Sequence, residues 1–379
     1  SYAGAEWKGE SLEGRDILLH SEQGIGDAIQ FIRYAPLLKA RGARRVYLEC
    51  PYPIAPLLGG VPALDGVIAR GVALPAYDVH ANLMSLPGLL ATTVETIPAT
   101  VPYIPVEPRP ARSAVQVAPG ELSVGFVWTG NPGHARDFLR SAPLDAFRPL
   151  AAIPGVRLFS LQKGAAAEHQ LESHPIAGVV NLAPVLDDFR DTAAVLDALD
   201  LVITVDTSVA HLAGALGKET WLLLPHVPDF RWMLERTDSP WYPTMRLFRQ
   251  PTPRDWATVF SEVEGALRQR VARQDARPSG LTVPANLTRS DDTVVTLPST
   301  TRLPDGRPRF DLWLPLALLA VPARFAEYEA ELLGHGSDMP LRAFLDEFLA
   351  VEDVLLDVQP GLGLTALSAA TTATPPAAL

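Results

Sequence analysis

The stretch LVITVDTSVAHLAGALG, residues Leu201–Gly217, is the part of the sequence that says most about its fold. It opens with five apolar or β-branched residues, a run typical of a strand buried on both faces. Asp206, Thr207 and Ser208 follow, and these residue types favour the position just before a helix. Apolar residues then recur at helical spacing until Gly217, which favours a helix end. The stretch therefore predicts a buried strand, a hydroxyl-rich turn and a helix.

The start of such a helix suits a phosphate group, because its first backbone N–H groups lack partners and carry a partial positive charge. One interpretation is that a nucleotide-linked ligand places its pyrophosphate at residues 206–208. An ordinary βα turn with a well-capped helix explains the same residues equally well. This stretch alone leaves both interpretations open.

The composition describes a large, acidic, globular chain. It has 379 residues, 47% of them hydrophobic and 20% charged, with a net charge of −11. An acidic surface argues against nucleic acid as a partner. Cys50 is the single cysteine, so an internal disulfide framework and a cysteine metal cluster are excluded, and a reducing, cytoplasmic location is expected. No apolar run is long enough to span a bilayer, while peripheral association with a membrane stays open.

The order of strand and helix signals predicts an α/β fold with two Rossmann-like domains that face a cleft, followed by an α+β extension. We expect an N-terminal domain over residues 1–110, a C-terminal domain over 120–272 and a further segment over 273–379. The proline-rich residues 105–120 indicate a linker. In the second domain a helix is expected over Ala142–Ala152, with Ser141 as its cap.

Several turns with chemically useful residues follow predicted strands, where ligands bind in open α/β sheets. They come from both halves and are expected to face one cleft. These turns are Gly24–Asp27, Thr129–Gly133, Gln162–Gly164 and Asp206–Ser208. Their agreement is a stronger indication of a ligand site than any single motif.

Asp27 is expected to open a helix, just after Gly24 and Gly26. The glycines allow the backbone to approach a ligand closely, and a carboxylate facing the cleft could accept a proton from an attacking hydroxyl. The alternative is that Asp27 only caps its helix. Lys163 could place a point charge on a phosphate, or it could be a solvated loop lysine. His211 could reach the cleft, although a histidine beside small residues is more often structural.

The segment Trp221–Gln250 is rich in aromatic residues and arginines. Such residues could stack a nucleobase or bind a phosphate, or they could cover the core between the halves. Trp232 and Trp241 are the ambiguous members. Zinc, calcium, P-loop, nucleophile-elbow and G-x-G-x-x-G patterns are not found in residues 1–270.

Residues 1–270 resemble the heptosyltransferase-like glycosyltransferases of family 9, especially the bacterial form that follows tetratricopeptide repeats. The matching segments are EQGIGDAIQFIRYAPLL (Glu22–Leu38), VGFVWTGNPGH (Val124–His134), RSAPL (Arg140–Leu144), FSLQKG (Phe159–Gly164), DTAAVLDALDLVITVDTSVAHLAGALG (Asp191–Gly217) and SPWYPTMRLFRQ (Ser239–Gln250). The resemblance implies a GT-B fold and the inverting, metal-independent transfer of a sugar, without a cofactor, from a nucleotide-sugar to a glycan or protein acceptor.

The resemblance also implies roles for individual residues. Asp27 falls where heptosyltransferases have their proposed catalytic base. The donor diphosphate would bind a motif that includes Asp206, Thr207, Ser208 and His211, while Lys163 falls near a phosphate-contacting lysine and Thr129 would lie at the cleft. Gly24 and Gly26 are expected to border the donor because they allow the backbone to approach it closely. Two alternatives remain: a non-catalytic module that binds a nucleotide-sugar or a partner, and a nucleotide-sugar epimerase.

The tail, from about residue 281 to 372, resembles the opening of an FkbM-type methyltransferase. Val354–Val358 followed by Gln359–Gly363 looks like its first strand and cofactor turn, and a helix is expected from Leu364. Gln359 and Pro360 replace the Gly-Ala pair that is usual there. We therefore expect no methyl transfer by this chain.

Overall fold

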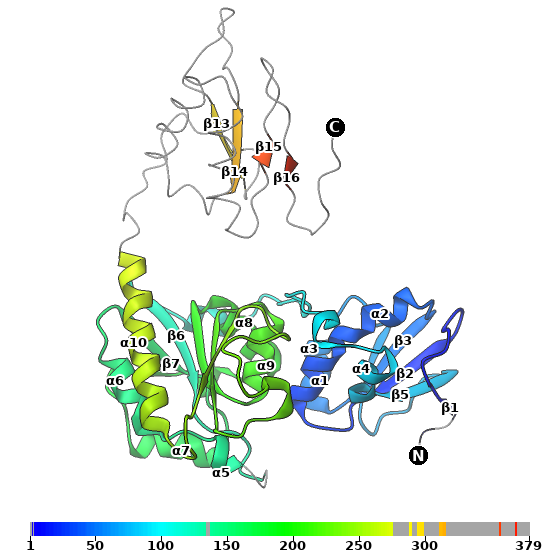
Figure 1. Ribbon diagram of the computed structural model, residues 1–379, viewed down its shortest axis with the longest axis horizontal. Coiled ribbons are helices and arrows are strands. Elements are labelled where there is room, and N and C mark those ends of the chain that lie inside the picture. The colour runs from blue at the N-terminus through cyan, green and yellow to red at the C-terminus, as the bar shows by residue number, and fades with distance from the viewer. Residues whose placement is uncertain are drawn as a thin grey trace, which may run out of the picture. The chain divides into compact units, whose positions relative to one another are not determined.

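The computed structural model of the chain describes residues 2, 4–133 and 137–275, and five short stretches nearer the carboxyl end, 288–289, 294–298, 311–315, 356–357 and 368–369. The chain divides into two compact units, Ser1–Gln274 and Asp275–Leu379. Figure 1 shows the helices and strands of the described residues with the labels used below.

The first half of the Ser1–Gln274 unit is built on a five-stranded parallel sheet of order β1-β5-β2-β3-β4. Its strands are β1 (Ala5–Glu6), β2 (Asp16–His20), β3 (Arg45–Cys50), β4 (Gly66–Ala69) and β5 (Val79–Asn82). The helices of this half are α1 (Ile25–Phe31), α2 (Ala35–Ala40), α3 (Ala55–Leu58) and α4 (Leu86–Leu89). Parallel neighbours require crossover connections, which the helices provide.

The second half is built on a six-stranded parallel sheet of order β11-β10-β9-β6-β7-β8. Its strands are β6 (Leu122–Val127), β7 (Val156–Ser160), β8 (Val180–Asn181), β9 (Leu201–Val205), β10 (Thr220–Leu224) and β11 (Met245–Arg249). The order is that of a Rossmann sheet, and the chain reverses its direction of progress between β6 and β9. Ligands of such sheets bind where the carboxyl ends of these two strands meet.

Helices cover this second sheet and connect its strands. They are α5 (Asp137–Arg140), α6 (Arg148–Ala151), α7 (Ala165–Ser173), α8 (Phe189–Ala198), α9 (Ser208–Ala215) and α10 (Trp256–Asp275). Every residue of β9 is buried, as the apolar run Leu201–Val205 predicts. Gly217 follows α9 with φ +70°, a conformation that glycine adopts without strain, so it ends the helix as expected.

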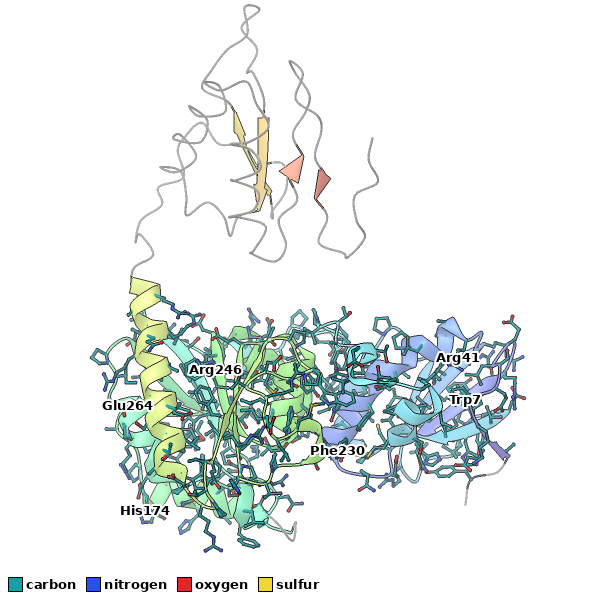
Figure 2. All side chains as sticks on the ribbon, in the orientation of Figure 1. Trp7, Arg41, His174, Phe230, Arg246 and Glu264 are labelled. Carbon is teal, nitrogen blue, oxygen red and sulfur yellow. The ribbon has the colours of Figure 1, made fainter. Side chains whose placement is uncertain are left out.

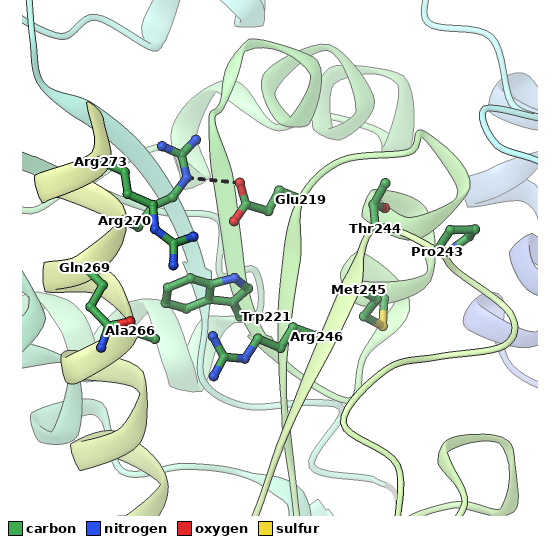
Figure 3. A pocket seen from close by; sticks show the side chains of 10 residues that line it. All are labelled: Glu219, Trp221, Pro243, Thr244, Met245, Arg246, Ala266, Gln269, Arg270 and Arg273. Carbon is green, nitrogen blue, oxygen red and sulfur yellow. Dashed lines mark hydrogen bonds and ion pairs between the residues drawn. The ribbon is translucent and has the colours of Figure 1, made fainter. Parts of the chain in front are cut away.

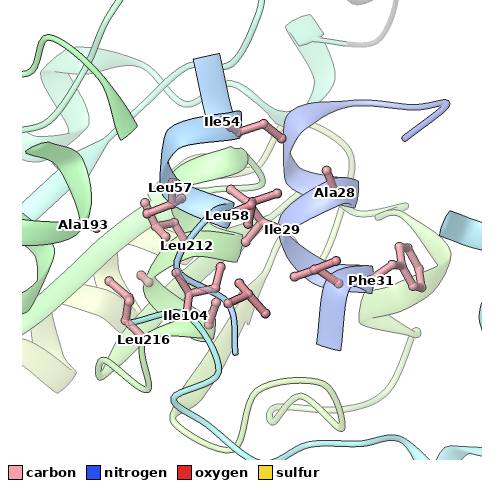
Figure 4. Packing of buried hydrophobic residues seen from close by; sticks show 14 of the residues in the cluster. Ala28, Ile29, Phe31, Ile54, Leu57, Leu58, Ile104, Ala193, Leu212 and Leu216 are labelled. Carbon is pink, nitrogen blue, oxygen red and sulfur yellow. The ribbon is translucent and has the colours of Figure 1, made fainter. Parts of the chain in front are cut away.

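The two halves share one apolar core. Ile29 of α1 and Leu57 and Leu58 of the α3 region belong to the same buried cluster as Leu212 and Leu216 of the α9 region (Figure 4). A second cluster lies on the other side of the six-stranded sheet, where residues of α10 cover it. Burying a leucine side chain contributes about 1.5–3 kcal/mol, so the shared cluster holds the two halves together.

The strand predicted at Leu201–Val205 is confirmed, while several other predicted boundaries differ. The helix expected over Ala142–Ala152 is a 3₁₀ turn, Leu144–Phe147, that continues into the short α6. Ser141 does not cap it, because Pro143 occupies the cap position. The expected linker 105–120 contains a 3₁₀ turn, η5 (Pro110–Ala114), which packs against α8. The three sequence-based domain boundaries stay predictions.

The Asp275–Leu379 unit contains two small antiparallel sheets among its described residues. One has the order β12-β13-β14, and the other pairs β15 with β16. Their strands are β12 (Thr288–Arg289), β13 (Val294–Pro298), β14 (Asp311–Pro315), β15 (Leu356–Asp357) and β16 (Ser368–Ala369). The expected helix from Leu364 is wrong at β16, and the turn Gln359–Gly363 lies outside the described residues, so the methyltransferase resemblance stays a prediction.

Candidate functional site

Asp27 lies in the first turn of α1, which begins two residues earlier than expected. Its Oδ2 atom accepts a hydrogen bond from the backbone N–H of Gly24 at 2.9 Å, which pairs a free donor at the helix end. Its Oδ1 atom accepts a hydrogen bond from Nη2 of Arg231 at 2.6 Å. Asp27 therefore caps its helix and also makes an ion pair with the second half of the unit.

Arg231 comes from the 3₁₀ turn η8 (Phe230–Trp232), which lies between β10 and β11. Phe230, its neighbour in sequence, is labelled where the two halves meet (Figure 2). Arg231 is only 8% exposed. Its Nη1 donates to Nε2 of His211 at 3.2 Å, and its Nε lies 2.9 Å from Oδ1 of Asp229. Burial lowers the pKa of Arg231, but nearby carboxylates, with Asp27 foremost, outweigh it and the pKa is raised.

His211 lies one turn into α9 and is buried. Its Nδ1 is 2.9 Å from the hydroxyl of Tyr242, and its ring stacks on Trp232 with centroids 5.5 Å apart. Burial, assisted by Arg231 and other cations, holds the pKa of His211 well below its ordinary value. A neutral ring fits its two partners, since Nε2 accepts from the arginine while Nδ1–H donates to the tyrosine.

Gly26 lies where α1 packs against α9. A Cβ atom at this position would lie 2.6 Å from Cδ2 of His211, well inside van der Waals contact. The glycine is therefore required by the packing of one helix against the other. The expected role in binding a donor stays a prediction for both Gly24 and Gly26.

Asp206, Thr207 and Ser208 occupy the turn between β9 and α9. Thr207 is in the cap position, and the first backbone hydrogen bond of the helix runs from the N–H of His211 to its carbonyl at 3.3 Å. Asp206 is buried, which raises the pKa of its carboxyl against the opposing effects of Trp232 and Arg231. Its Oδ1 lies 3.7 Å from Nε2 of His211. The turn thus adjoins His211, the same histidine that Arg231 contacts.

Thr129 and Lys163 have separate partners. Thr129 follows β6, and its hydroxyl lies 2.8 Å from that of Ser141 and 3.3 Å from Oδ2 of Asp137. Lys163 follows β7, and its Nζ donates to the carbonyl of Ala183 at 2.9 Å. The structure brings Asp27 together with the α9 turn, whereas Lys163 is directed to a backbone carbonyl.

Sequence reasoning missed two arginines. Arg231 was included only as part of an aromatic, arginine-rich segment, and its partner Asp27 is 204 positions away. Arg33, from η1 (Ile32–Tyr34), is buried and donates to the carbonyl of Trp241 in the other half and to the hydroxyl of Tyr103 at 2.9 Å. Trp232 and Trp241 are both buried, so they cover the core between the halves.

A cavity of about 240 Å³ lies elsewhere, at the amino ends of β10 and β11 beside α10. Figure 3 shows Trp221 in its wall, with Arg246 nearby and an ion pair between Arg270 and Glu219. Ligands of parallel sheets bind at the opposite, carboxyl ends of the strands. We therefore do not assign this cavity to the site formed by Asp27 and α9.

Comparison with known proteins identifies proteins that share this fold. Residues 155–222 match the family model described as Glycosyltransferase family 9 (heptosyltransferase). The structure is similar to that of a glycosyltransferase of family 9 from Veillonella parvula DSM 2008, with a TM-score of 0.53 and 10% identity over 70% of this chain and 99% of the other. The expected GT-B fold is thereby confirmed.

Two more individual proteins are similar to this chain. Protein FlbA of Caulobacter vibrioides (strain ATCC 19089 / CIP 103742 / CB 15) is 27% identical over 300 residues, which are 71% of this chain and 49% of FlbA. The chain thus spans about half the length of this relative. The ADP-heptose lipopolysaccharide heptosyltransferase II of E. coli has a TM-score of 0.47 and 17% identity over 67% of this chain and 99% of its own.

In the part of the chain that the structure describes, no helix is long and apolar enough to cross a membrane. Among the same residues, no group of three or more histidine, cysteine, aspartate or glutamate side chains is arranged to hold a metal ion.

Proposed function

We propose that this chain transfers a sugar from a nucleotide-sugar to an acceptor hydroxyl with inversion of configuration. The observation that carries the proposal is that Arg231 bonds both the Asp27 carboxylate and His211 in the first turn of α9. A candidate base on one Rossmann-like half thus adjoins a candidate phosphate site on the other. The family match at residues 155–222 covers β9 and α9 and supports the same reaction class.

In this proposal the donor diphosphate binds at Asp206–Ser208. The first N–H groups of α9 have no partner within the helix, and they present a partial positive charge to an anion. The turn follows β9, one of the two strands at the switch point of the Rossmann sheet. Thr129 follows β6, the other strand at that point, so it is proposed to border the same ligand.

Asp27 is proposed to act as general base. The acceptor oxygen attacks the anomeric carbon, its proton passes to the Asp27 carboxylate, and the bond from the anomeric carbon to the phosphate oxygen breaks. The nucleoside diphosphate leaves with the electron pair of that bond, and attack from the opposite face inverts the anomeric centre. We propose that no metal is required, because helix N–H groups and side-chain cations stabilise the leaving charge.

Lys163 is proposed to contact a donor phosphate after a change in its side-chain position. Its side chain is half exposed and bonded to the Ala183 carbonyl, so it would have to leave this partner to reach a ligand. A cytoplasmic location is also part of the proposal, since nucleotide-sugars and an unpaired cysteine fit a reducing compartment. The proposed acceptor is a glycan or a protein.

The test begins with a thermal-shift screen against nucleotides and nucleotide-sugars. The best donor is then incubated with the protein and candidate acceptors, and released nucleoside diphosphate is measured. Asp27→Asn should abolish transfer while the nucleotide still binds, and Asp145→Asn, at an exposed position, is the matched control. Wild-type turnover by Asp27→Asn would rule out the proposed base.

A second candidate function is a module that binds a nucleotide-sugar without transferring the sugar. It is favoured by one observation, namely that both oxygens of Asp27 already have hydrogen-bond partners. Such a module would bind the same donor and leave it intact with every acceptor tried. An epimerase would instead change the sugar in the absence of an acceptor.

A further inference from the structure

The ion pair between Asp27 and Arg231 blocks the carboxylate that the proposed reaction needs. Oδ2 is held by the backbone N–H of Gly24, and Oδ1 is held by Nη2 of Arg231. The side chain of Asp27 is only 19% exposed, which leaves little of it open to an incoming hydroxyl. Each oxygen keeps a second lone pair, but with so little of the side chain exposed an acceptor hydroxyl gains access where one of these two partners gives way.

Of the two partners, Arg231 is the one that can move. The N–H of Gly24 is fixed by the backbone at the start of α1, whereas the arginine is a long side chain in a short 3₁₀ turn. Its Nε has no hydrogen-bond partner with acceptable geometry, although it lies 2.9 Å from Asp229. The guanidinium can therefore change partners while its backbone stays in place.

A new partner for Arg231 would bind very close by. Its Nη1 already contacts Nε2 of His211, which is in the first turn of α9, and Oδ1 of Asp206 lies 3.7 Å from that same nitrogen. A diphosphate at this helix start carries more charge than a carboxylate and matches the planar donor pattern of a guanidinium. The diphosphate would thus compete with Asp27 for the same arginine.

We propose that Arg231 is exchanged between Asp27 and the donor diphosphate, so that the Asp27 carboxylate becomes available only after the donor has bound. The inference rests on the proposed function and adds an order to it, with donor first and acceptor second. It also makes Arg231 the side-chain cation that contacts the leaving diphosphate. Asp27 therefore does not remove a proton from an acceptor before the donor has bound.

The exchange predicts whether Asp27→Asn strengthens or weakens the binding of a diphosphate. Calorimetry measures the affinity of UDP, GDP, ADP, CDP, dTDP and inorganic pyrophosphate for the wild type and for Asp27→Asn. Removing the competing carboxylate charge frees Arg231, so the variant should bind the preferred diphosphate roughly three- to tenfold more tightly. If the ion pair only fastened the two halves together, the same variant would bind more weakly.

Variants of the arginine provide the second arm. Arg231→Gln should weaken binding of the preferred diphosphate at least about tenfold, because a buried charged hydrogen bond is lost. Arg231→Lys keeps the charge and should recover part of the affinity. Arg236→Gln is the matched control, because Arg236 lies in the same loop but pairs with Asp238, and it should not change binding. Melting curves confirm that each variant is folded.

The outcomes separate the two proposals. If Asp27→Asn binds the diphosphate as tightly as the wild type or more weakly, the exchange is overturned. The proposed function is then unaffected, because the protein still binds the nucleotide. If Asp27→Asn does not fold, Asp27→Ser keeps a helix-capping oxygen and carries the same test. Failure of all six probes to bind the wild type would remove the proposed function itself, and the exchange with it.

Discussion

Replacing Gly26 by alanine tests the direct packing of α1 against α9. The new methyl carbon would lie 2.6 Å from Cδ2 of His211, whereas carbon atoms in contact are usually about 3.5–4.0 Å apart. The two helices, or the histidine ring, would have to move by about 1 Å. The ring cannot move freely, since Tyr242 and Arg231 bind its two nitrogens and Trp232 stacks on its face.

Two opposing effects set the size of the change in stability. Inserting a methyl group into a well-packed contact costs about 1–3 kcal/mol. Alanine is better than glycine in a helix by about 0.5–1 kcal/mol. The clash outweighs the gain in helix propensity, so we expect Gly26→Ala to lower the free energy of unfolding by about 1–2 kcal/mol. For a unit of this size that corresponds to a fall in Tm of about 2–8 °C.

Scanning calorimetry of the variant and of Gly265→Ala is the assay. A Cβ atom at Gly265 in α10 would meet no atom within 4 Å, so only the gain in helix propensity acts there and Tm should rise slightly. Combining Gly26→Ala with His211→Ala should remove the clash and recover part of the loss. A Gly26→Ala protein that melts at or above the wild-type temperature would refute the reasoning.

Three further predictions concern buried groups. His211 has a pKa of about 6.5 in the unfolded state and a lower pKa in the folded state. As the pH falls below about 6.5, only the unfolded protein takes up this proton, so the free energy of unfolding decreases until the pH reaches the folded-state pKa. Denaturation midpoints of His211→Gln should fall less over the same pH range, and equal slopes would contradict this. Burial raises the pKa of the Cys50 thiol to about 12, so a thiol reagent should label it only after denaturation, and rapid labelling of folded protein would contradict this. Arg33→Lys should lower the free energy of unfolding by about 2–4 kcal/mol in urea titrations, because it leaves the carbonyl of Trp241 and other buried acceptors without a planar donor. A loss below about 1 kcal/mol would show that lysine replaces those contacts.

Strands β9 and β10 were predictable because each is a short apolar run with a clear end, whereas the two exposed residues of β1 form no such run. The run Leu201–Val205 is buried throughout, as its composition indicates. The first residue of each helix was harder to predict, because several residues near a turn can serve as a cap. Asp27 was expected to open α1, yet Gly24 is in the cap position and Asp27 lies in the first turn. Ser141 resembles a cap but bonds to neighbouring side chains instead.

The site was predictable in part for a related reason. A strand end and a helix start are local features, so residues such as Asp206, Thr207 and Ser208 could be singled out from sequence. The pairing of Asp27 with Arg231 depends on how two halves pack, which no local pattern encodes. Lys163 shows the same limit, because its position after a strand was predicted correctly while its partner, a carbonyl 20 residues later, was not.

The shared apolar cluster also bears on how the chain folds during its synthesis. Ile29 and Leu58 belong to the first half but are buried in one cluster with Leu212 and Leu216, which are made much later. A ribosome adds about 5–20 residues per second, so roughly 150 intervening residues take on the order of 8–30 s. During that interval the nascent first half exposes an apolar surface, which makes it a natural client for a chaperone that acts on growing chains.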